Sequence, residues 1–186
     1  MTASTRFRLT GRTRKTFLVL HIITAAAWFG IDLALGILIV TAMLTSDPQT
    51  AGMALQVVDL FAIWPMFVAS LLCLGTGVVL GLGSKYGLIR YKWVTVKLGI
   101  NVAMSVLIFF SLRPGVGAAA TIGERLMAGD LSAQVPEGLI YPVVVAPTLL
   151  LIAYFLSTFK PWGRTPAGRE RPAEPRAPRT RTPVGV

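Results

Sequence analysis

Four apolar runs, each at least as long as a bilayer core is thick, constrain this chain more than any other feature of its sequence. An α-helix rises 1.5 Å per residue, so roughly 20 apolar residues cross a hydrocarbon core of about 30 Å. The runs cover residues 16–44, 60–82, 93–112 and 139–159. Charged residues make up only 14% of the chain, against about 25% in soluble domains. The sequence therefore predicts an all-α fold, a four-transmembrane-helix bundle.

The basic residues predict how this bundle is oriented. Five precede the first run, three lie between residues 85 and 92, and seven lie from residue 160 onward. Short links rich in Lys and Arg stay on the cytoplasmic side of a membrane. We therefore expect a multi-pass protein of the plasma membrane with both termini cytoplasmic and with the links 45–50 and 113–138 outside. The first run is too long for the apolar stretch of a signal peptide, so it is expected to be a retained helix. The link 113–138 contains a predicted surface helix over 118–127.

The chain divides into a basic N-terminal segment (1–15), a transmembrane domain (16–159) and a tail (160–186). The tail holds six prolines, six arginines and few apolar residues, so it is predicted to be disordered. The net charge of +10 resides in the two ends, and both are expected to bind anionic lipid headgroups at about 1 kcal/mol per basic residue. Nucleic-acid binding is not expected, because Trp162 is the only aromatic residue near the tail that could stack on bases.

Motifs of soluble enzymes are missing from the sequence. It contains no CxxC, no HExxH, no P-loop and no GxGxxG between a strand and a helix. Its one cysteine, Cys73, lies in the middle of the second run and is interpreted as a small packing residue. Whether the chain is an enzyme stays open at this point.

Ionisable residues inside a span are costly and usually face the bundle interior, so each is a candidate site residue. His21, Trp28 and Asp32 lie 7 and 11 residues apart, which places them on one face of the first helix. Lys97 lies in the third span, followed one turn later by Asn101. Counted from the cytoplasmic ends of their spans, His21 and Lys97 both lie about 6 to 8 Å deep.

Each candidate has a structural interpretation as well. His21 can bond a backbone carbonyl or a hydroxyl, and Lys97 can extend to the headgroups. Asp32 can pair with Arg113, Asp59 can cap the second span, and Trp28 can pack in the core. The pair Gly77-x-x-x-Gly81 can serve close helix packing or leave room for a flat ligand at the level of His21.

Two sequence patterns resemble known families. The run from Leu20 to Gly30, LHIITAAAWFG, resembles the first helix of HemJ-type protoporphyrinogen oxidases, which are four-helix membrane proteins, and more loosely that of CopD-type membrane domains. Trp93-x-x-Val96-Lys97-Leu98 resembles the start of the third HemJ span. The wider pattern is similar to a group of actinobacterial membrane proteins. The chain departs from HemJ at Thr95 and over 106–111, where that family has histidines, and in its long basic tail.

The resemblance implies a haem b or porphyrin site in the inner leaflet between the first and third spans. It implies His21 as the ligand of the haem iron and Lys97 as a propionate partner or second ligand, and Trp28 and Asn101 are expected to line such a site. With one histidine per chain, ligation by two histidines would require a homodimer. Copper is not favoured, because one His and one Cys do not make a soft-ligand cluster.

Two other classes of function remain open in the sequence. One is a small transporter or transporter subunit, working as a dimer, in which Asp32 and Asp59 take up and release protons or substrates. The other is a membrane scaffold or assembly partner without chemistry of its own. A haem absorption band, an uptake phenotype lost with Asp32→Asn, and co-purified neighbours distinguish the three classes.

Overall fold

All elements in the described part of the chain are helices, and a computed structural model describes residues 9–84, 87–130 and 132–165. No strand occurs in those ranges. The predicted all-α class is therefore confirmed. In chain order the elements are α1 (Gly11–Leu44), α2 (Pro48–Ala62), α3 (Trp64–Leu82), α4 (Lys92–Leu107), the π-helical turn η1 (Ile108–Leu112), α5 (Arg113–Met127), the 3-10 turn η2 (Glu137–Leu139) and α6 (Ile140–Phe159).

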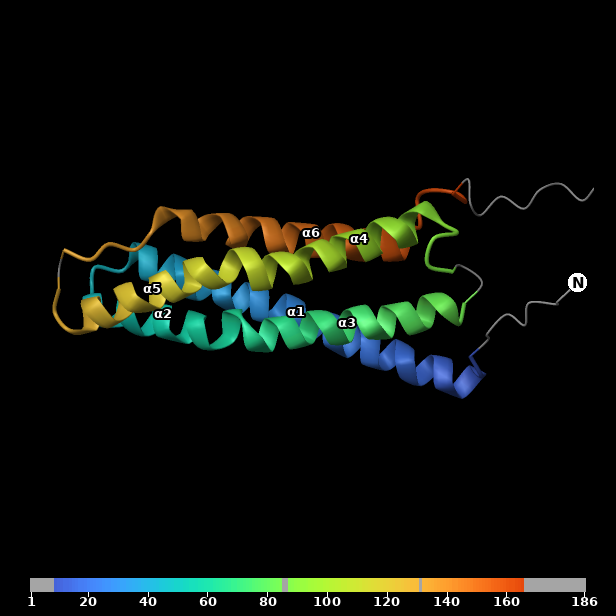
Figure 1. Ribbon diagram of the computed structural model, residues 1–186, viewed down its shortest axis with the longest axis horizontal. Coiled ribbons are helices and arrows are strands. Elements are labelled where there is room, and N and C mark those ends of the chain that lie inside the picture. The colour runs from blue at the N-terminus through green and yellow to red at the C-terminus, as the bar shows by residue number, and fades with distance from the viewer. Residues whose placement is uncertain (1–8, 85–86, 131, 166–186) are drawn as a thin grey trace, which may run out of the picture.

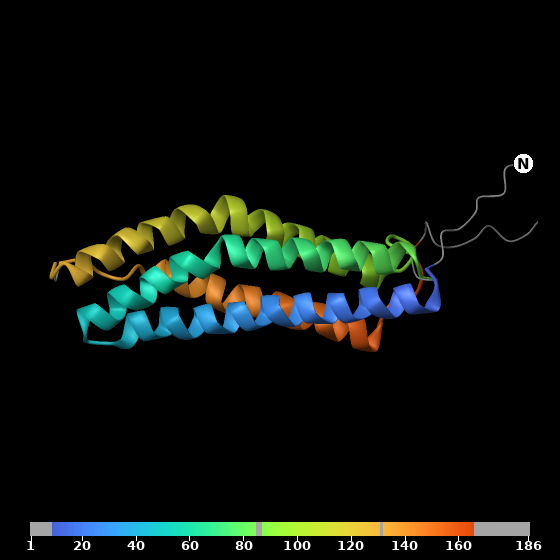
Figure 2. The same cartoon turned by 90° about the horizontal axis from the view of Figure 1, so that it is seen from below.

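These elements form four segments that run up and down the long axis of the bundle (Figures 1 and 2). Each segment is long and apolar enough to cross a membrane: Gly11–Leu44, Pro48–Leu82, Lys92–Met127 and Glu137–Phe159. The chain is thus a multi-pass membrane protein. Both described ends and the link from α3 to α4 lie at one end of the bundle, and the other two links lie at the opposite end (Figure 1).

The four segments enclose a single core in a ring of neighbours. Helix α1 packs against α2, α3 and α6, α3 packs against α4, α4 packs against α6, and α2 packs against α5. Many large apolar side chains stay on the outer surface, including Ile37 (68% exposed), Leu60 (67%) and Phe155 (62%). In a bilayer these side chains face lipid, which is why so apolar an exterior is stable.

The first helix begins earlier than expected. The side chain of Thr10 accepts a hydrogen bond from the backbone N–H of Thr13 at 3.4 Å, which caps the helix, so residues 11–15 form its first turn. Its 34 residues extend about 51 Å, well beyond a core of about 30 Å. Helix α6, with 20 residues, matches the core length, so α1 projects beyond one or both faces of the membrane.

The second segment also starts earlier, at Pro48. Asp47 caps α2 through hydrogen bonds from the backbone N–H groups of Gln49 (3.3 Å) and Thr50 (3.0 Å). The expectation that Asp59 caps this span was wrong, because Asp59 lies within α2 and is exposed. The helix breaks at Ile63. Pro65 has no N–H to continue the helical hydrogen bonds, and its ring would clash with the carbonyl four residues earlier in a regular helix.

Instead of a loop after residue 112, the third segment continues as a helix. Helix α4 runs into the π-helical turn η1 and then into α5, although the span was expected to end at residue 112. A proline has no N–H and its ring clashes with the carbonyl four residues earlier, here Phe110 within η1. The wider π turn relieves that clash without ending the helix. The predicted surface helix 118–127 is therefore the last part of α5.

Helices α2 and α5 approach each other closely at two glycines. A Cβ at Gly52 would lie 2.7 Å from the backbone oxygen of Gly123, and one at Gly123 would lie 2.9 Å from the oxygen of Gly52. Next to this crossing, the amide of Gln56 donates a hydrogen bond to the carbonyl of Ala120 at 2.7 Å. The two helices therefore form a tightly packed pair at the end of the bundle opposite the described termini.

The start of the C-terminal tail is ordered. The backbone N–H of Thr165 donates to the carbonyl of Arg90 at 2.9 Å, and Tyr91 pairs with Arg164 in an isolated antiparallel bridge. Residues 160–165, which were predicted to belong to the disordered tail, thus pack against the link from α3 to α4. Residues 166–186 lie outside the described part of the chain.

Candidate functional site

His21 is held against α3 by its Nδ1 atom. That atom lies 3.1 Å from the backbone oxygen of Cys73 and 3.0 Å from Oγ1 of Thr76. A carbonyl oxygen only accepts hydrogen bonds, so Nδ1 donates and carries the proton. In the neutral ring, Nε2 then holds the free lone pair. The structural interpretation of His21, a bond to a backbone carbonyl and a hydroxyl across helices, is what the structure shows.

The glycine pair in α3 makes room for side chains. A Cβ at Gly77 would lie 3.1 Å from Cε1 of His21, so the missing side chain leaves space for the imidazole. A Cβ at Gly81 would lie 2.5 Å from Cδ2 of Leu88 in the following link. Neither glycine brings two helix backbones together, in contrast to Gly52 and Gly123.

Lys97 turns toward α6. Its ammonium group donates a hydrogen bond of 2.9 Å to Oγ of Ser157. It is also close enough to interact electrostatically with His21 and with Cys73. Four helices therefore contribute to one polar cluster, with His21 from α1, Cys73 and Thr76 from α3, Lys97 from α4 and Ser157 from α6. We refer to these five residues as the His21 cluster.

Cys73 is a buried member of this cluster, and Asn101 lies beside it. The sulfur of Cys73 is 3.9 Å from Nδ1 of His21, and the side chains of Thr24 and Asn101 approach the thiol. The side-chain oxygen of Asn101 is buried without a hydrogen-bond partner. Cys73, Thr76 and Ser157 were not predicted as partners of His21 and Lys97, and their polar atoms within apolar runs were the available signal.

The stripe predicted on α1 faces the interior. Trp28 is fully buried and Asp32 is 5% exposed, one turn further along the helix. Within residues 9–84, 87–130 and 132–165, neither Nε1 of Trp28 nor Oδ2 of Asp32 has a hydrogen-bond partner. The expected pair of Asp32 with Arg113 is not formed, because the Arg113 guanidinium lies 5.5 Å from the centre of the Phe109 ring. Asp59, the second acid of the transport hypothesis, is exposed on α2.

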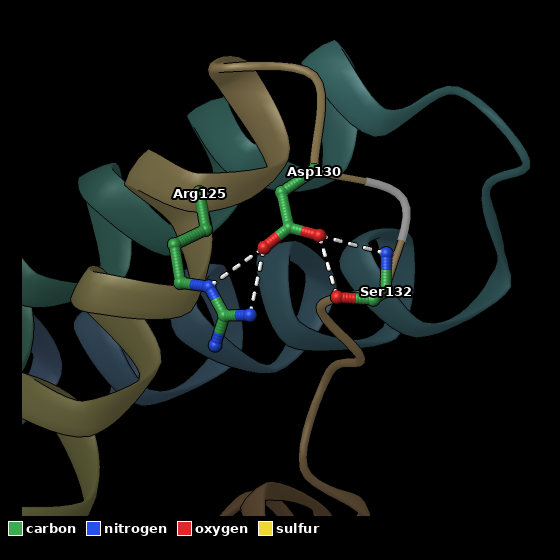
Figure 3. A network of polar contacts seen from close by, with 3 residues as sticks. All are labelled: Arg125, Asp130 and Ser132. Atoms are coloured by element: carbon green, nitrogen blue, oxygen red, sulfur yellow. Dashed lines mark hydrogen bonds and ion pairs between the residues drawn. The ribbon is translucent and has the colours of Figure 1, made fainter.

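A separate polar network ties the end of α5 to the link that follows it (Figure 3). Nε and Nη2 of Arg125 donate to one carboxylate oxygen of Asp130 at 2.9 and 2.7 Å. The hydroxyl and the backbone N–H of Ser132 donate to the other at 2.6 and 3.0 Å. The hydrogen bond from the Ser132 hydroxyl, followed by those from Arg125, lowers the pKa of Asp130 to about 2. This network belongs to the link from α5 to α6 and lies at the other end of the bundle from the His21 cluster (Figure 1).

The His21 cluster offers few groups for a metal ion. No group of three or more His, Cys, Asp or Glu side chains that could hold a metal occurs in the described ranges. A single imidazole with a fixed ring orientation suits a cofactor that brings most of its own ligands, as haem does. No family model, curated protein or solved structure matches this chain.

Proposed function

We propose that this membrane protein binds haem b through Nε2 of His21, with both termini on the cytoplasmic side of the plasma membrane. The observation that carries the proposal is the hydrogen bond from Nδ1 of His21 to the carbonyl of Cys73. It fixes the tautomer and leaves Nε2 free, since Nε2 has no hydrogen-bond partner in the described part of the chain. Iron-ligating histidines depend on such a bond at the other ring nitrogen.

Lys97 is the residue proposed to meet the rest of the cofactor. Its ammonium lies within electrostatic reach of the imidazole and bonds only a neutral hydroxyl, that of Ser157. It would therefore attract a propionate or, when neutral, serve as a second ligand of the iron. Bound haem would supply one-electron redox chemistry, and His21 and Lys97 are the residues that would hold it.

The distribution of charge supports the proposed orientation. The end that holds the described termini carries Arg12, Arg14, Lys15, Arg90, Lys92, Lys160 and Arg164. The opposite end carries Asp47, Glu124, Arg125, Asp130 and Glu137, which are mostly acidic. Under the positive-inside rule the first end is cytoplasmic. The basic termini would also bind anionic headgroups.

An absorption spectrum tests the haem proposal. Protein purified from haem-replete cells should show a Soret band, and His21→Gly should lose most of it. Added imidazole should restore the band in His21→Gly by filling the space of the lost ring, which distinguishes ligation from general damage. Cys73→Ser keeps the backbone carbonyl and should retain the band. A colourless wild-type protein would reject haem binding and favour the transporter or scaffold class.

The orientation has its own test. In a Cys73→Ser background, a cysteine at Ser132 should react with an impermeant maleimide added to intact cells, and one at Thr10 should react only after permeabilisation. The reverse labelling pattern would contradict cytoplasmic termini, whatever the haem experiment shows.

A further inference from the structure

A cavity of 560 Å³ lies between the helices on the side of the bundle away from the His21 cluster. Its walls come from α1, from the end of α4 with η1 and α5, and from α6, and Val58, Ala62 and Met66 of the second segment also line it. This volume is in the range of pockets that hold drug-sized ligands, about 300 to 1,000 Å³. The lining is almost entirely aliphatic.

Asp32 is the one charged side chain among the described residues that line this cavity. Asp32 is only 5% exposed, and its Oδ2 atom has no hydrogen-bond partner in the described part of the chain. The nearest basic residue in the third segment, Arg113, is exposed and lies over the Phe109 ring. Among the described residues the carboxylate therefore lacks a counter-charge, a costly arrangement inside an apolar cavity.

A second acceptor belongs to the opposite wall. Pro147 within α6 has no N–H, so the carbonyl of Val143 lacks the donor that a regular helix would supply. Val143 also lines the cavity and packs close to Gly36, one turn beyond Asp32 on α1. The helices that carry Asp32 and Val143 therefore face each other across the cavity.

We propose that this cavity binds a lipophilic amine, a molecule with an apolar body and one protonated amine. The amine bonds the carboxylate of Asp32 and the apolar body fills the space between α1, α5 and α6. Ammonium provides both the missing charge and the missing donors, which a neutral apolar molecule does not.

Helices α5 and α6 both line the cavity, and they are not among the helix pairs that pack closely against each other. The two helices belong to the third and fourth segments of the bundle (Figures 1 and 2). Ser111 and Tyr141, the other polar side chains of the lining, are both exposed, Tyr141 to 71%. They mark a mouth through which an amphipathic molecule reaches Asp32.

This site is independent of the proposed haem site. Asp32 lies 11 residues beyond His21 on the same helix, or about 16 Å along its axis. Neither His21 nor Lys97 lines the cavity. The amine proposal can therefore fail while haem binding holds, and the reverse is equally true.

Binding of dibenzylamine to the full chain in nanodiscs tests the proposal, with dibenzyl ether as a neutral molecule of the same shape. Empty nanodiscs give the background from partition into lipid. The wild-type chain should bind the amine at pH 7 saturably and at least tenfold more tightly than the ether. Asp32→Asn should weaken amine binding about 10- to 100-fold, as expected for a lost charged hydrogen bond, and leave ether binding unchanged.

Cavity-filling variants give a second arm that does not depend on Asp32. Gly115 lines the cavity and has no atom within 4 Å of a Cβ placed there, so Gly115→Leu should fill the space and weaken binding of both molecules. Gly117→Leu, in the same helix but outside the lining, and Asp59→Asn, an exposed acid, should change neither. Equal binding of amine and ether by the wild type, unchanged amine affinity in Asp32→Asn, or unchanged binding in Gly115→Leu would overturn the proposal.

Discussion

The imidazole of His21 lies directly against Gly77 of α3, so that a methyl group at Gly77 would stand 3.1 Å from Cε1 of the ring. This contact, together with the bond from Nδ1 to Cys73, determines where the ring sits and which nitrogen is free. The orientation of the candidate haem ligand thus depends on the absence of a side chain on a neighbouring helix.

Replacing Gly77 should displace His21. We expect Gly77→Val to destabilise the protein by about 1 to 3 kcal/mol, as overpacking in a close-packed interior usually does. Thermal unfolding in detergent measures the effect. Gly75→Val is the matched control, because no atom lies within 4 Å of a Cβ at Gly75 on the same helix. Equal melting temperatures for the two variants would contradict the contact.

The bond between Lys97 and Ser157 should stabilise the packing of α4 against α6. A hydrogen bond to a charged group contributes about 1.5 to 3 kcal/mol. In a double-mutant cycle, Lys97→Met and Ser157→Ala should therefore show a coupling energy of that order. Thr158→Ala serves as the comparison, because the Thr158 hydroxyl donates to Tyr154 of its own helix. Purely additive effects of Lys97→Met and Ser157→Ala would show that the bond does not form.

The crossing of α2 and α5 should tolerate no side chain at Gly123. We expect Gly123→Ala to lower the melting temperature, because its Cβ would lie 2.9 Å from the backbone oxygen of Gly52 and 3.1 Å from Cβ of Leu55. Gly117→Ala, on the same helix with no atom within 4 Å, should instead raise it, since Ala is favoured over Gly in a helix by about 1 kcal/mol. Changes of the same sign in both variants would exclude this close approach.

The link from α5 to α6 should lose the stabilising contribution of Asp130 only at very low pH. Because the pKa of Asp130 is lowered from 3.8 to about 2, its contribution to folding is present above pH 3.8 and is lost as the pH falls through about 2. Carbon-13 NMR of the Asp130 carboxyl should show that pKa directly. Ser132→Ala and Arg125→Gln should each raise it, because each removes a donor that favours the carboxylate. A pKa that neither variant moves would mean that the network in Figure 3 does not form.

The His21 cluster and the cavity beside Asp32 could be predicted from the sequence only in part. The spacing of His21, Trp28 and Asp32 indicated one inward face, and the structure buries Trp28 and Asp32. The partners of His21 could not be predicted, because Cys73 and Thr76 lie 52 and 55 residues away and meet it only through the packing of α1 on α3. The cavity beside Asp32 could not be predicted either, since its lining comes from all four segments of the bundle.

By itself the sequence determined the class, the four apolar segments and the separation of charge between the two ends, because burial in lipid depends on composition and length along one helix. It did not determine where helices end: the span predicted over 60–82 is interrupted at Ile63, and the span predicted to end at residue 112 continues through a π turn into α5. Tertiary structure decided those outcomes, and it also decided which polar groups meet. Which polar groups meet depends on contacts between helices that are far apart in the sequence, as when α1 packs on α3 and brings His21 to the carbonyl of Cys73.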